Sequence, residues 1–319
     1  MRQIVKLALV AMAISYTGAA FAQVVSIATP PQGSVWNTMA SVMAGQAREK
    51  SDLMIVVLLM AGIDSMLQAL NQGRAEFTLD DVNDVITASS GTGEWDEKLE
   101  NLRIVARINP FPVGLYVKKA DGLENVADLK GKSVPSGWDG FPLARSHIDG
   151  ILAAAELTMD DVNGVPVPEL IRGSDAFAAG SVDSAFFAVG GPKVAEVDAA
   201  VGGVRFLKVD ASNEALQRIQ SVRPAFYFSQ VDPAPFRVGV ENSMAFVTWD
   251  NVLVAGANVS DESVTKLLTT IADNQAAMAK AYPPLGAFAI ERAFKAYPGV
   301  EYHKAAVAFF AQRGIEQSQ

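Results

Sequence analysis

The sequence contains no cysteine in its 319 residues. This absence excludes disulfide bonds, a thiolate nucleophile, a cysteine-ligated metal and the lipid-modified cysteine of a bacterial lipoprotein. The folded chain must therefore be held together by its hydrophobic core. A mature length of roughly 300 residues is ample for such a core and fits two domains of ordinary size.

Histidine is also scarce, and the two that occur, His147 and His303, belong to no HExxH or other metal-ligand spacing. Gly131-Lys132-Ser133 resembles the end of a P-loop, but the glycine required five positions before Gly131 is Val126. There is no Gly-x-Ser-x-Gly elbow either. We therefore expect no catalytic residues, no cofactor and no bound metal, and the chain is predicted not to be an enzyme.

No apolar run reaches the roughly 20 residues that a bilayer-spanning helix needs. The first residues instead combine a basic start at Arg2 and Lys6, an apolar run over residues 7–14, and the small-x-small sequence Ala20-Phe21-Ala22. This combination predicts a signal peptide over residues 1–22, cut after Ala22, and a periplasmic location. An N-terminal membrane anchor is the alternative, for which the apolar run is too short.

Positive charge is in deficit, because 26 lysines and arginines face 35 acidic residues and give a formal charge of −9. Loss of residues 1–22 removes Arg2 and Lys6 but no acid, which changes −9 to −11. Nucleic acids and anionic membrane surfaces are poor partners for such a chain. A small anionic ligand is not excluded, because the charge of a pocket is local.

One motif occurs twice, about a hundred residues apart. The first copy runs from Gly62 through Gly73 to Phe77, and the second from Gly173 through Gly180 to Phe187. Each is interpreted as a capped helix, a glycine stop, an acidic residue and a buried strand. The two glycines are 11 residues apart in one copy and 7 in the other, a difference close to one helical turn. The duplication predicts two similar lobes with a cleft between them.

Strand-like and helical patterns alternate in both halves of the chain, which predicts largely parallel sheets. In the first half we expect strands at 24–28, 53–59 and 75–79, and helices at 35–49 and 64–72. Residues 102–109 and 113–118 are predicted as two strands split by Pro110-Phe111-Pro112, since proline lacks the amide donor that a central strand needs. This segment is predicted to be the first crossing between the lobes.

The second half repeats the pattern before returning to the first lobe. The expected strands are 133–135, 164–166, 185–189 and 204–209, and the expected helices are 142–155 and 193–200. Residues 223–237 are expected to be irregular, residues 242–255 to form the return crossing, and residues 261–282, 286–296 and 303–312 to be helices. The predicted domains are 23–110 with 243–319 for the first lobe and 111–242 for the second.

Several stretches of sequence resemble the TAXI-type solute receptors of tripartite ATP-independent periplasmic (TRAP) transporters. They lie at 126–134, 153–162, 182–192 and 225–228, and with the duplicated motif they cover nearly the whole mature chain. The Asp-Leu-Lys-Gly-Lys sequence at 128–132 is shared by many type II periplasmic binding proteins, whereas Asp-x-Ala-Phe-Phe-x-x-Gly-Gly at 183–191 is more discriminating. The resemblance implies an α/β, two-lobed fold in which each lobe is a mostly parallel sheet flanked by helices and two crossing strands join the lobes.

The resemblance is weakest in the loops that would hold a ligand. Residues 28–37 replace the glycine-rich loop with a tyrosine pair that the family usually has, and residues 60–65 and 80–84 also depart from its pattern. The scaffold is therefore kept while the ligand loops differ.

Ligands of open α/β sheets sit at the carboxyl ends of strands, beside helix N-termini. Four loops meet this condition, at 32–37, 62–65, 137–141 and 188–192. The predicted ligand-binding residues are Ser34, Trp36, Gly62, Asp64, Asp81, Asn109, Trp138, Phe141, Arg145, Gly190 and Gly191.

Each of these residues also has a purely structural interpretation. Ser34 can be a helix cap, and Trp36 and Trp138, predicted to close on the ligand from opposite sides, can be core residues. Arg145 can be a surface residue rather than a ligand clamp. Residues 80–84 can be a polar turn from which only Asp81 faces the cleft.

The expected function is that of an extracytoplasmic solute receptor. We expect a monomer that closes its lobes on a small organic molecule of the carboxylate or amino acid class and delivers it to a TRAP-type membrane permease. A receptor that feeds a sensor kinase is the first alternative. An enzyme on the same fold, such as a prephenate dehydratase, is the second; a hydroxymethylbilane synthase would need a cysteine for its cofactor.

Overall fold

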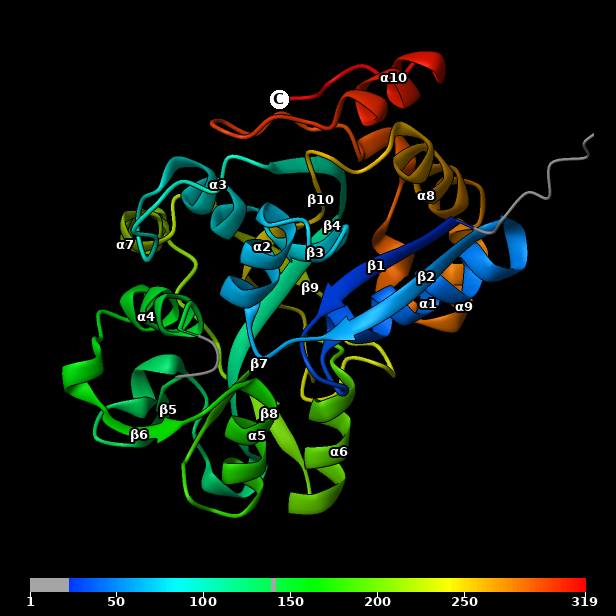
Figure 1. Ribbon diagram of the computed structural model, residues 1–319. Coiled ribbons are helices and arrows are strands. Elements are labelled where there is room, and N and C mark those ends of the chain that lie inside the picture. The colour runs from blue at the N-terminus through cyan, green and yellow to red at the C-terminus, as the bar shows by residue number, and fades with distance from the viewer. Residues whose placement is uncertain (1–22, 139–141) are drawn as a thin grey trace, which may run out of the picture.

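The computed structural model describes residues 23–138 and 142–319, so the predicted signal peptide and Phe141 lie outside the described residues. Within these ranges, one eight-stranded sheet has the order β2-β1-β3-β10-β4-β7, with β8 also paired to β4 and β9 to β10. The strands β5 and β6 form a separate parallel pair. Figure 1 shows the long strand β4 running from the neighbourhood of β3 and β10 down to β7 and β8.

In the first lobe, β1 pairs in parallel with β2 on one side and with β3 on the other. Its elements are β1 (Gln23–Thr29), α1 (Val35–Lys50), β2 (Leu53–Leu59), α2 (Ile63–Asn71), β3 (Phe77–Asp81) and α3 (Val82–Ser90). Helix α1 forms because Ser34 caps it and because Val35, Met39 and Met43 recur every four residues as a buried stripe. The expected strand at 75–79 starts two residues later, and α3 was not expected.

The two crossing strands are β4 (Leu102–Lys118) and β10 (Met244–Gly256), which pair antiparallel. The prediction that Pro110 and Pro112 interrupt the first crossing is wrong, because both lie inside β4, opposite Asp250 and Thr248. The carbonyl of Pro112 accepts from the amide of Val189, on the edge of β4 that faces away from β10. The nitrogens of both prolines face that same edge, because the nitrogen and the carbonyl of a strand residue point to the same side. Strand β7 pairs with this edge only from residue 113 onward. The missing proline N–H groups therefore remove no hydrogen bond between β4 and β10.

The second lobe follows the expected order with two additions. Its elements are β5 (Ser133–Gly137), α4 (Ala144–Ala154), β6 (Asn163–Val167), α5 (Leu170–Ala178), β7 (Ala185–Ala188), α6 (Pro192–Val201), β8 (Val204–Phe206), α7 (Asn213–Val222) and β9 (Tyr227–Val231). Helix α7 was not expected, and β9 corrects the irregular structure predicted for residues 223–237. Strand β9 forms because the stretch between Pro224 and Pro233 is free of proline and its aromatic residues Tyr227 and Phe228 pair with β10.

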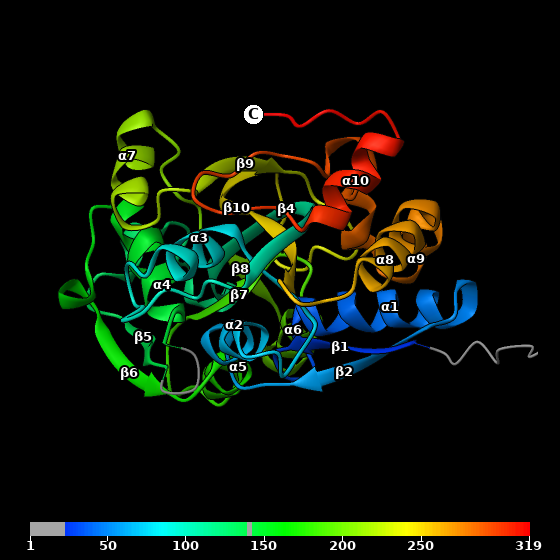
Figure 2. The same ribbon diagram turned by 45° about the horizontal axis from the view of Figure 1, so that its top comes forward.

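The C-terminal helices return to the first lobe, where α10 (Lys304–Gln312) packs on α8 (Asp261–Asp273), as Figures 1 and 2 show. The helix expected over 261–282 is broken at Asn274, after which α9 (Gln275–Ala281) begins. The helix expected over 286–296 is also wrong, since this stretch holds only short 3-10 turns at Pro283–Ala287 and Ile290–Arg292. No helix in the described ranges combines the length and the apolar character needed to cross a membrane.

The duplicated motif is real, but its second copy starts earlier than predicted. Gly173 lies inside α5, whose N-cap is Glu169, so it does not correspond to Gly62, the N-cap of α2. Both helices have nine residues, and both end before a glycine with positive φ, +68° at Gly73 and +78° at Gly180. The spacing from N-cap to glycine is therefore the same in the two lobes, and Glu169 is the counterpart of Gly62.

Candidate functional site

A cavity of about 40 Å³ lies between the two lobes. One wall comes from the first lobe, through the loops that precede α1 and α2, and the opposite wall comes from the start of α5 and from β7. Phe111 and Val113 of β4 and Trp249 of β10 also line it, so the crossing strands form part of its boundary. The volume is room for about three water molecules. Separation of the two walls would make room for a larger ligand.

The first-lobe wall contains two helix N-termini. The Oγ of Ser34 accepts from the backbone amide of Asn37 at 3.1 Å and so caps α1. Gly62 caps α2 without a side chain, and the Oγ of Ser65 donates to its carbonyl at 2.6 Å. The free amides and the positive ends of these helices favour a negatively charged or carbonyl oxygen.

The second-lobe wall contains an acidic group at the corresponding place. Glu169 lines the cavity, and its two carboxylate oxygens accept from the amides of Ile171 at 2.7 Å and Arg172 at 2.9 Å. The amides at the start of α5 therefore bind a carboxylate of the chain itself. Leu170, Phe186 and Phe187 complete an otherwise apolar surface.

A column of aromatic rings runs along the cavity. The ring of Phe111 lies between Trp36, with centroids 5.5 Å apart, and Trp249, 5.3 Å away, and Trp249 stacks in turn on Phe226 at 4.9 Å. The indole N–H groups of Trp36 and Trp249 are buried and find no hydrogen-bond acceptor among the described residues. Rings in these arrangements are worth about 0.5–1.5 kcal/mol per pair beyond their buried area.

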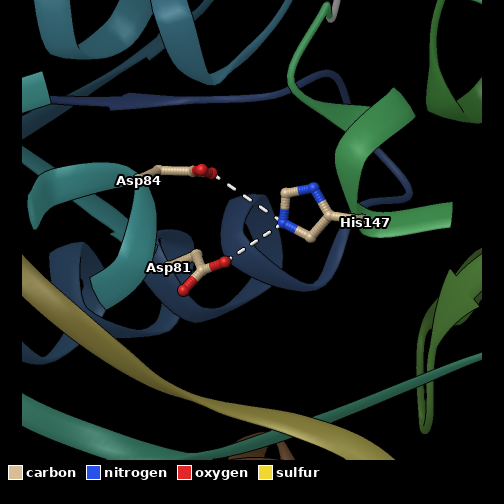
Figure 3. A group of neighbouring side chains, drawn as sticks. All are labelled: Asp81, Asp84 and His147. Carbon is tan, nitrogen blue, oxygen red and sulfur yellow. Dashed lines mark hydrogen bonds and ion pairs between the residues drawn. The ribbon is translucent and has the colours of Figure 1, made fainter. Parts of the chain in front are cut away.

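His147 lines the cavity and connects it to a buried group of charged side chains that lies behind it. The ring of His147 packs edge-on against Trp249, with centroids 4.8 Å apart. Figure 3 shows Asp81 and Asp84, from the end of β3 and from α3, both directed toward one ring nitrogen of His147 on α4. The Nε2 atom lies 3.1 Å from Asp81 Oδ2 and 3.8 Å from Asp84 Oδ2. The group thus joins the first lobe to the second.

Arg223, which follows α7, supplies the positive charge of this group. Its Nη1 lies 2.6 Å from Asp84 Oδ1, and its Nη2 lies 3.3 Å from Asp81 Oδ2 and 2.8 Å from His147 Nε2. The His147 Nδ1 lies 2.8 Å from the carbonyl of Leu143, which only accepts, so Nδ1 donates; Nε2 lies 2.8 Å from Arg223 Nη2, which only donates, so Nε2 accepts. This is the arrangement of a neutral imidazole.

Burial controls the protonation of these groups. It lowers the pKa of His147 to about 3, with Arg223 acting in the same direction. Burial raises the pKa of Asp81 to about 7 against the opposing charge of Arg223. Burial and the neighbouring carboxylates raise the pKa of Asp80 well above its usual range, and burial also raises that of Asp84. One arginine does not offset three carboxylates, so protonation removes the excess negative charge.

The ligand atoms of Asp81, Asp84 and His147 lie within 4.8 Å of one another, close enough for a metal ion. The guanidinium of Arg223 already contacts the same three side chains at 2.6–3.3 Å. A metal ion there would lie against a fixed positive charge, which is unfavourable. The cation of this group is the arginine.

Three of the predicted binding residues line the cavity, namely Ser34, Trp36 and Gly62. Asp81 is fully buried behind His147 rather than in a polar turn, as are Asp80 and Asp84. The interpretation of residues 80–84 as a polar turn is wrong, because this segment is the end of an interior strand and the start of α3, whose N-cap is Asp81.

The structure does not bring the other predicted residues to the cavity. Trp138, predicted to face Trp36, is only 1 % exposed and packs against Gly173 inside the second lobe. Arg145 is exposed and pairs with Asp149 at 3.6 Å, and Asn109 accepts from Asn251 at 3.1 Å within the sheet. Asp64 lies half-buried in the first turn of α2, where burial raises its pKa.

Gly190 and Gly191 pack against other side chains of the protein. The carbonyl of Gly190 accepts from the hydroxyl of Tyr282 at 3.0 Å. A Cβ at Gly191 would lie 2.6 Å from the ring of Phe187. Side chains of the protein, rather than a ligand, therefore contact both of these predicted binding residues.

Sequence reasoning missed Glu169, His147 and Trp249. Glu169 was detectable, because it stands 11 residues before Gly180 as Gly62 stands before Gly73. His147 and Trp249 carry no motif. Their place at the cavity follows from the packing of α4 and β10.

In a comparison with known protein families, the NMT1-like family matches residues 27–314 of this chain. Among solved structures, MatC from Rhodopseudomonas palustris with bound malate has a TM-score of 0.60 at 16 % identity, covering 91 % of this chain and 95 % of that one.

Two other structures are similar over nearly the whole chain. The alkanesulfonate-binding protein SsuA from Xanthomonas axonopodis pv. citri, bound to MOPS, has a TM-score of 0.51 at 17 % identity, with 93 % and 96 % covered. PhnD1 from Prochlorococcus marinus with methylphosphonate has a TM-score of 0.53 at 11 % identity, with 92 % and 99 % covered. These likenesses confirm the predicted type II periplasmic binding protein fold.

Proposed function

This chain belongs to the NMT1-like family, and from that premise we propose that it is a periplasmic solute receptor that closes its two lobes on a small organic molecule. The observation that carries the proposal is the cavity, because its walls come from different lobes and the crossing strands β4 and β10 line it as well. Bending of those two strands would separate the walls and admit a ligand. In this proposal the first lobe consists of residues 23–110 and 243–319, and the second lobe of residues 111–242, as predicted from the sequence.

The binding free energy that such a receptor requires is modest. Micromolar affinity corresponds to about 8 kcal/mol. Burial of a ligand against Trp36, Phe111 and Trp249, together with hydrogen bonds at Ser34 and Gly62, is sufficient for that. The two unpartnered indole N–H groups are further donors on residues that line the cavity.

The proposed output is delivery of the ligand to a TRAP-type membrane permease by a monomeric receptor. Support comes from the resemblance of residues 126–134 and 182–192 to TAXI-type receptors, and from the signal peptide expected at residues 1–22 with its cut after Ala22. A gene for a membrane permease of many spans beside the gene for this chain would favour transport. A neighbouring histidine kinase would favour the sensor alternative.

The test is a thermal-shift screen of the mature protein against carboxylates, amino acids and aromatic acids. A ligand that binds between the lobes raises the melting temperature as its concentration rises above Kd. Products are then sought by mass spectrometry after long incubation. Conversion of the ligand would establish the enzyme alternative instead.

The matched variants are Trp36→Ala and Trp138→Ala, two buried tryptophans, one in the first turn of α1 and one directly after β5, of which only the first lines the cavity. We expect Trp36→Ala to weaken binding of the best ligand at least tenfold and Trp138→Ala to change affinity less than twofold. Equal affinities in both variants and the parent protein would place the binding site elsewhere.

A further inference from the structure

The described residues that line the cavity include an acidic side chain but no lysine or arginine. Among these lining residues, Glu169 is the one acidic side chain, and His147 is neutral. Arg223 lies behind His147, where Asp81 and Asp84 neutralise it. An anionic ligand would therefore find no unpaired cation in the cavity wall, but it would find a carboxylate.

Glu169 is held in place while keeping the capacity to bind a ligand. Each carboxylate oxygen accepts one backbone amide of α5, at 2.7 and 2.9 Å. A carboxylate offers about four acceptor positions, so two remain for a donor from the cavity. The same bonds occupy the helix N-terminus that would otherwise hold a ligand anion, whereas its counterpart Gly62 brings no carboxylate to α2.

The remaining surface suits an organic cation. The rings of Trp36, Phe111, Phe186, Phe187 and Trp249 line the cavity. The faces of such rings attract alkylammonium groups, and more strongly when water is excluded. A small apolar cavity with one carboxylate combines both requirements.

We propose that the ligand of this cavity carries an organic ammonium group on an apolar body, bound by Glu169 and the aromatic rings. The inference rests on the proposed receptor function and narrows its ligand class. A dicarboxylate is disfavoured, because one of its charges would lie beside Glu169. A carboxylate at the other end of the ligand is allowed, since Ser34 and the starts of α1 and α2 form the opposite wall. Quaternary amines and apolar amino acids share this chemistry.

The test is isothermal titration of the mature protein with four probes: choline, its uncharged isostere 3,3-dimethylbutan-1-ol, L-leucine and L-malate. We expect choline or L-leucine to bind, and choline to bind at least tenfold more tightly than its isostere, which is about 1.4 kcal/mol. Comparison of choline with L-leucine distinguishes a quaternary amine from an amino acid. Malate should bind most weakly of the charged probes.

The variant is Glu169→Gln, which keeps one oxygen to cap α5 and removes the charge. It should weaken binding of the ammonium probe at least tenfold and lower the melting temperature only slightly, since one of the two cap bonds is kept. The control is Glu214→Gln, which removes an exposed glutamate from the first turn of α7 that does not line the cavity, and it should leave affinity unchanged.

Different failures separate this inference from the proposed function. Equal binding of choline and its isostere, tighter binding of malate, or a neutral ligand as the best hit of the thermal-shift screen would overturn the ammonium assignment and leave the receptor intact. Binding of none of the screened molecules would overturn both.

Discussion

Replacement of Asp81 by asparagine should stabilise the protein at alkaline pH and leave it nearly unchanged at acid pH. The carboxyl of Asp81 is fully buried, with Oδ1 accepting from the amide of Asn83 at 2.8 Å to cap α3. Asparagine has the same shape and keeps this cap. The substitution therefore removes the ability to ionise and little else.

The magnitude follows from the pKa of Asp81, which burial raises from 3.8 to about 7. Each unit is worth about 1.4 kcal/mol, so ionisation of this group costs the folded protein about 4 kcal/mol. The raised pKa means that the folded state binds the proton more tightly than the unfolded state. The resulting stabilisation is complete below about pH 4 and is lost as the pH rises through 7. Asparagine does not ionise, so the variant keeps it.

His147 contributes a pH dependence of the opposite sign. Its pKa is lowered to about 3, so its contribution is fully present above its unfolded value of 6.5 and is lost as the pH falls toward 3. The other charged groups that interact with Asp81 are Asp80, Asp84, Arg223 and Asp250. Asp81→Asn also removes the repulsion by which ionised Asp81 raises the pKa of Asp80 and Asp84, so the difference between variant and parent includes this coupling.

The measurement is urea unfolding followed by tryptophan fluorescence, at pH 4.5 and pH 8.5. We expect Asp81→Asn to exceed the parent by only about 1 kcal/mol at pH 4.5 and by up to about 4 kcal/mol at pH 8.5. The exposed Asp96→Asn is the control and should match the parent at both values. Equal destabilisation by Asp81→Asn at both pH values would refute the reasoning, because it would show that Arg223 requires the ionised carboxylate.

Two further predictions concern packing and charge. Gly191→Ala should cost about 1–3 kcal/mol in urea unfolding, because its Cβ would lie 2.6 Å from the ring of Phe187, although φ at this glycine is an ordinary −67°; a cost below 0.5 kcal/mol would show that the ring moves freely. Asp250→Asn should cost about 3 kcal/mol at pH 7, since this buried carboxylate pairs with Arg107 at 2.8 Å and Lys295 at 2.9 Å. Because these cations lower the pKa of Asp250 despite its burial, the cost measured by urea unfolding should shrink as the pH falls below 4, and a constant cost would contradict the charge argument.

The sequence predicted most elements of the fold but not how the crossing strand passes its prolines. A proline in a strand is disfavoured only when its nitrogen faces a neighbouring strand. Local sequence does not say which edge of β4 is paired at Pro110 and Pro112, because that depends on where β7 ends. The same limit explains β9, whose pairing partner β10 is separated from it by the loop that follows.

The candidate site was predictable where a helix begins and unpredictable where residues meet by packing. Ser34 and Gly62 were found because N-caps have sequence signals. Trp138 was misplaced because an aromatic residue in a loop packs either outward or inward, and here it covers Gly173. Arg223, His147 and Asp81 come from three separate segments, and no local pattern links them.

The sequence by itself determined the repeating strand and helix pattern, the two lobes implied by the duplicated motif, and the resemblance to solute receptors, because all of these depend on local periodicity and spacing. The tertiary structure alone decided that Glu169 lines the same cavity as Ser34 and Gly62, and that Arg223 is buried between Asp81 and Asp84. Burial and charge pairing are properties of residues that are distant in sequence and close in space. They set both the protonation of Asp81 and the charge that a ligand would meet.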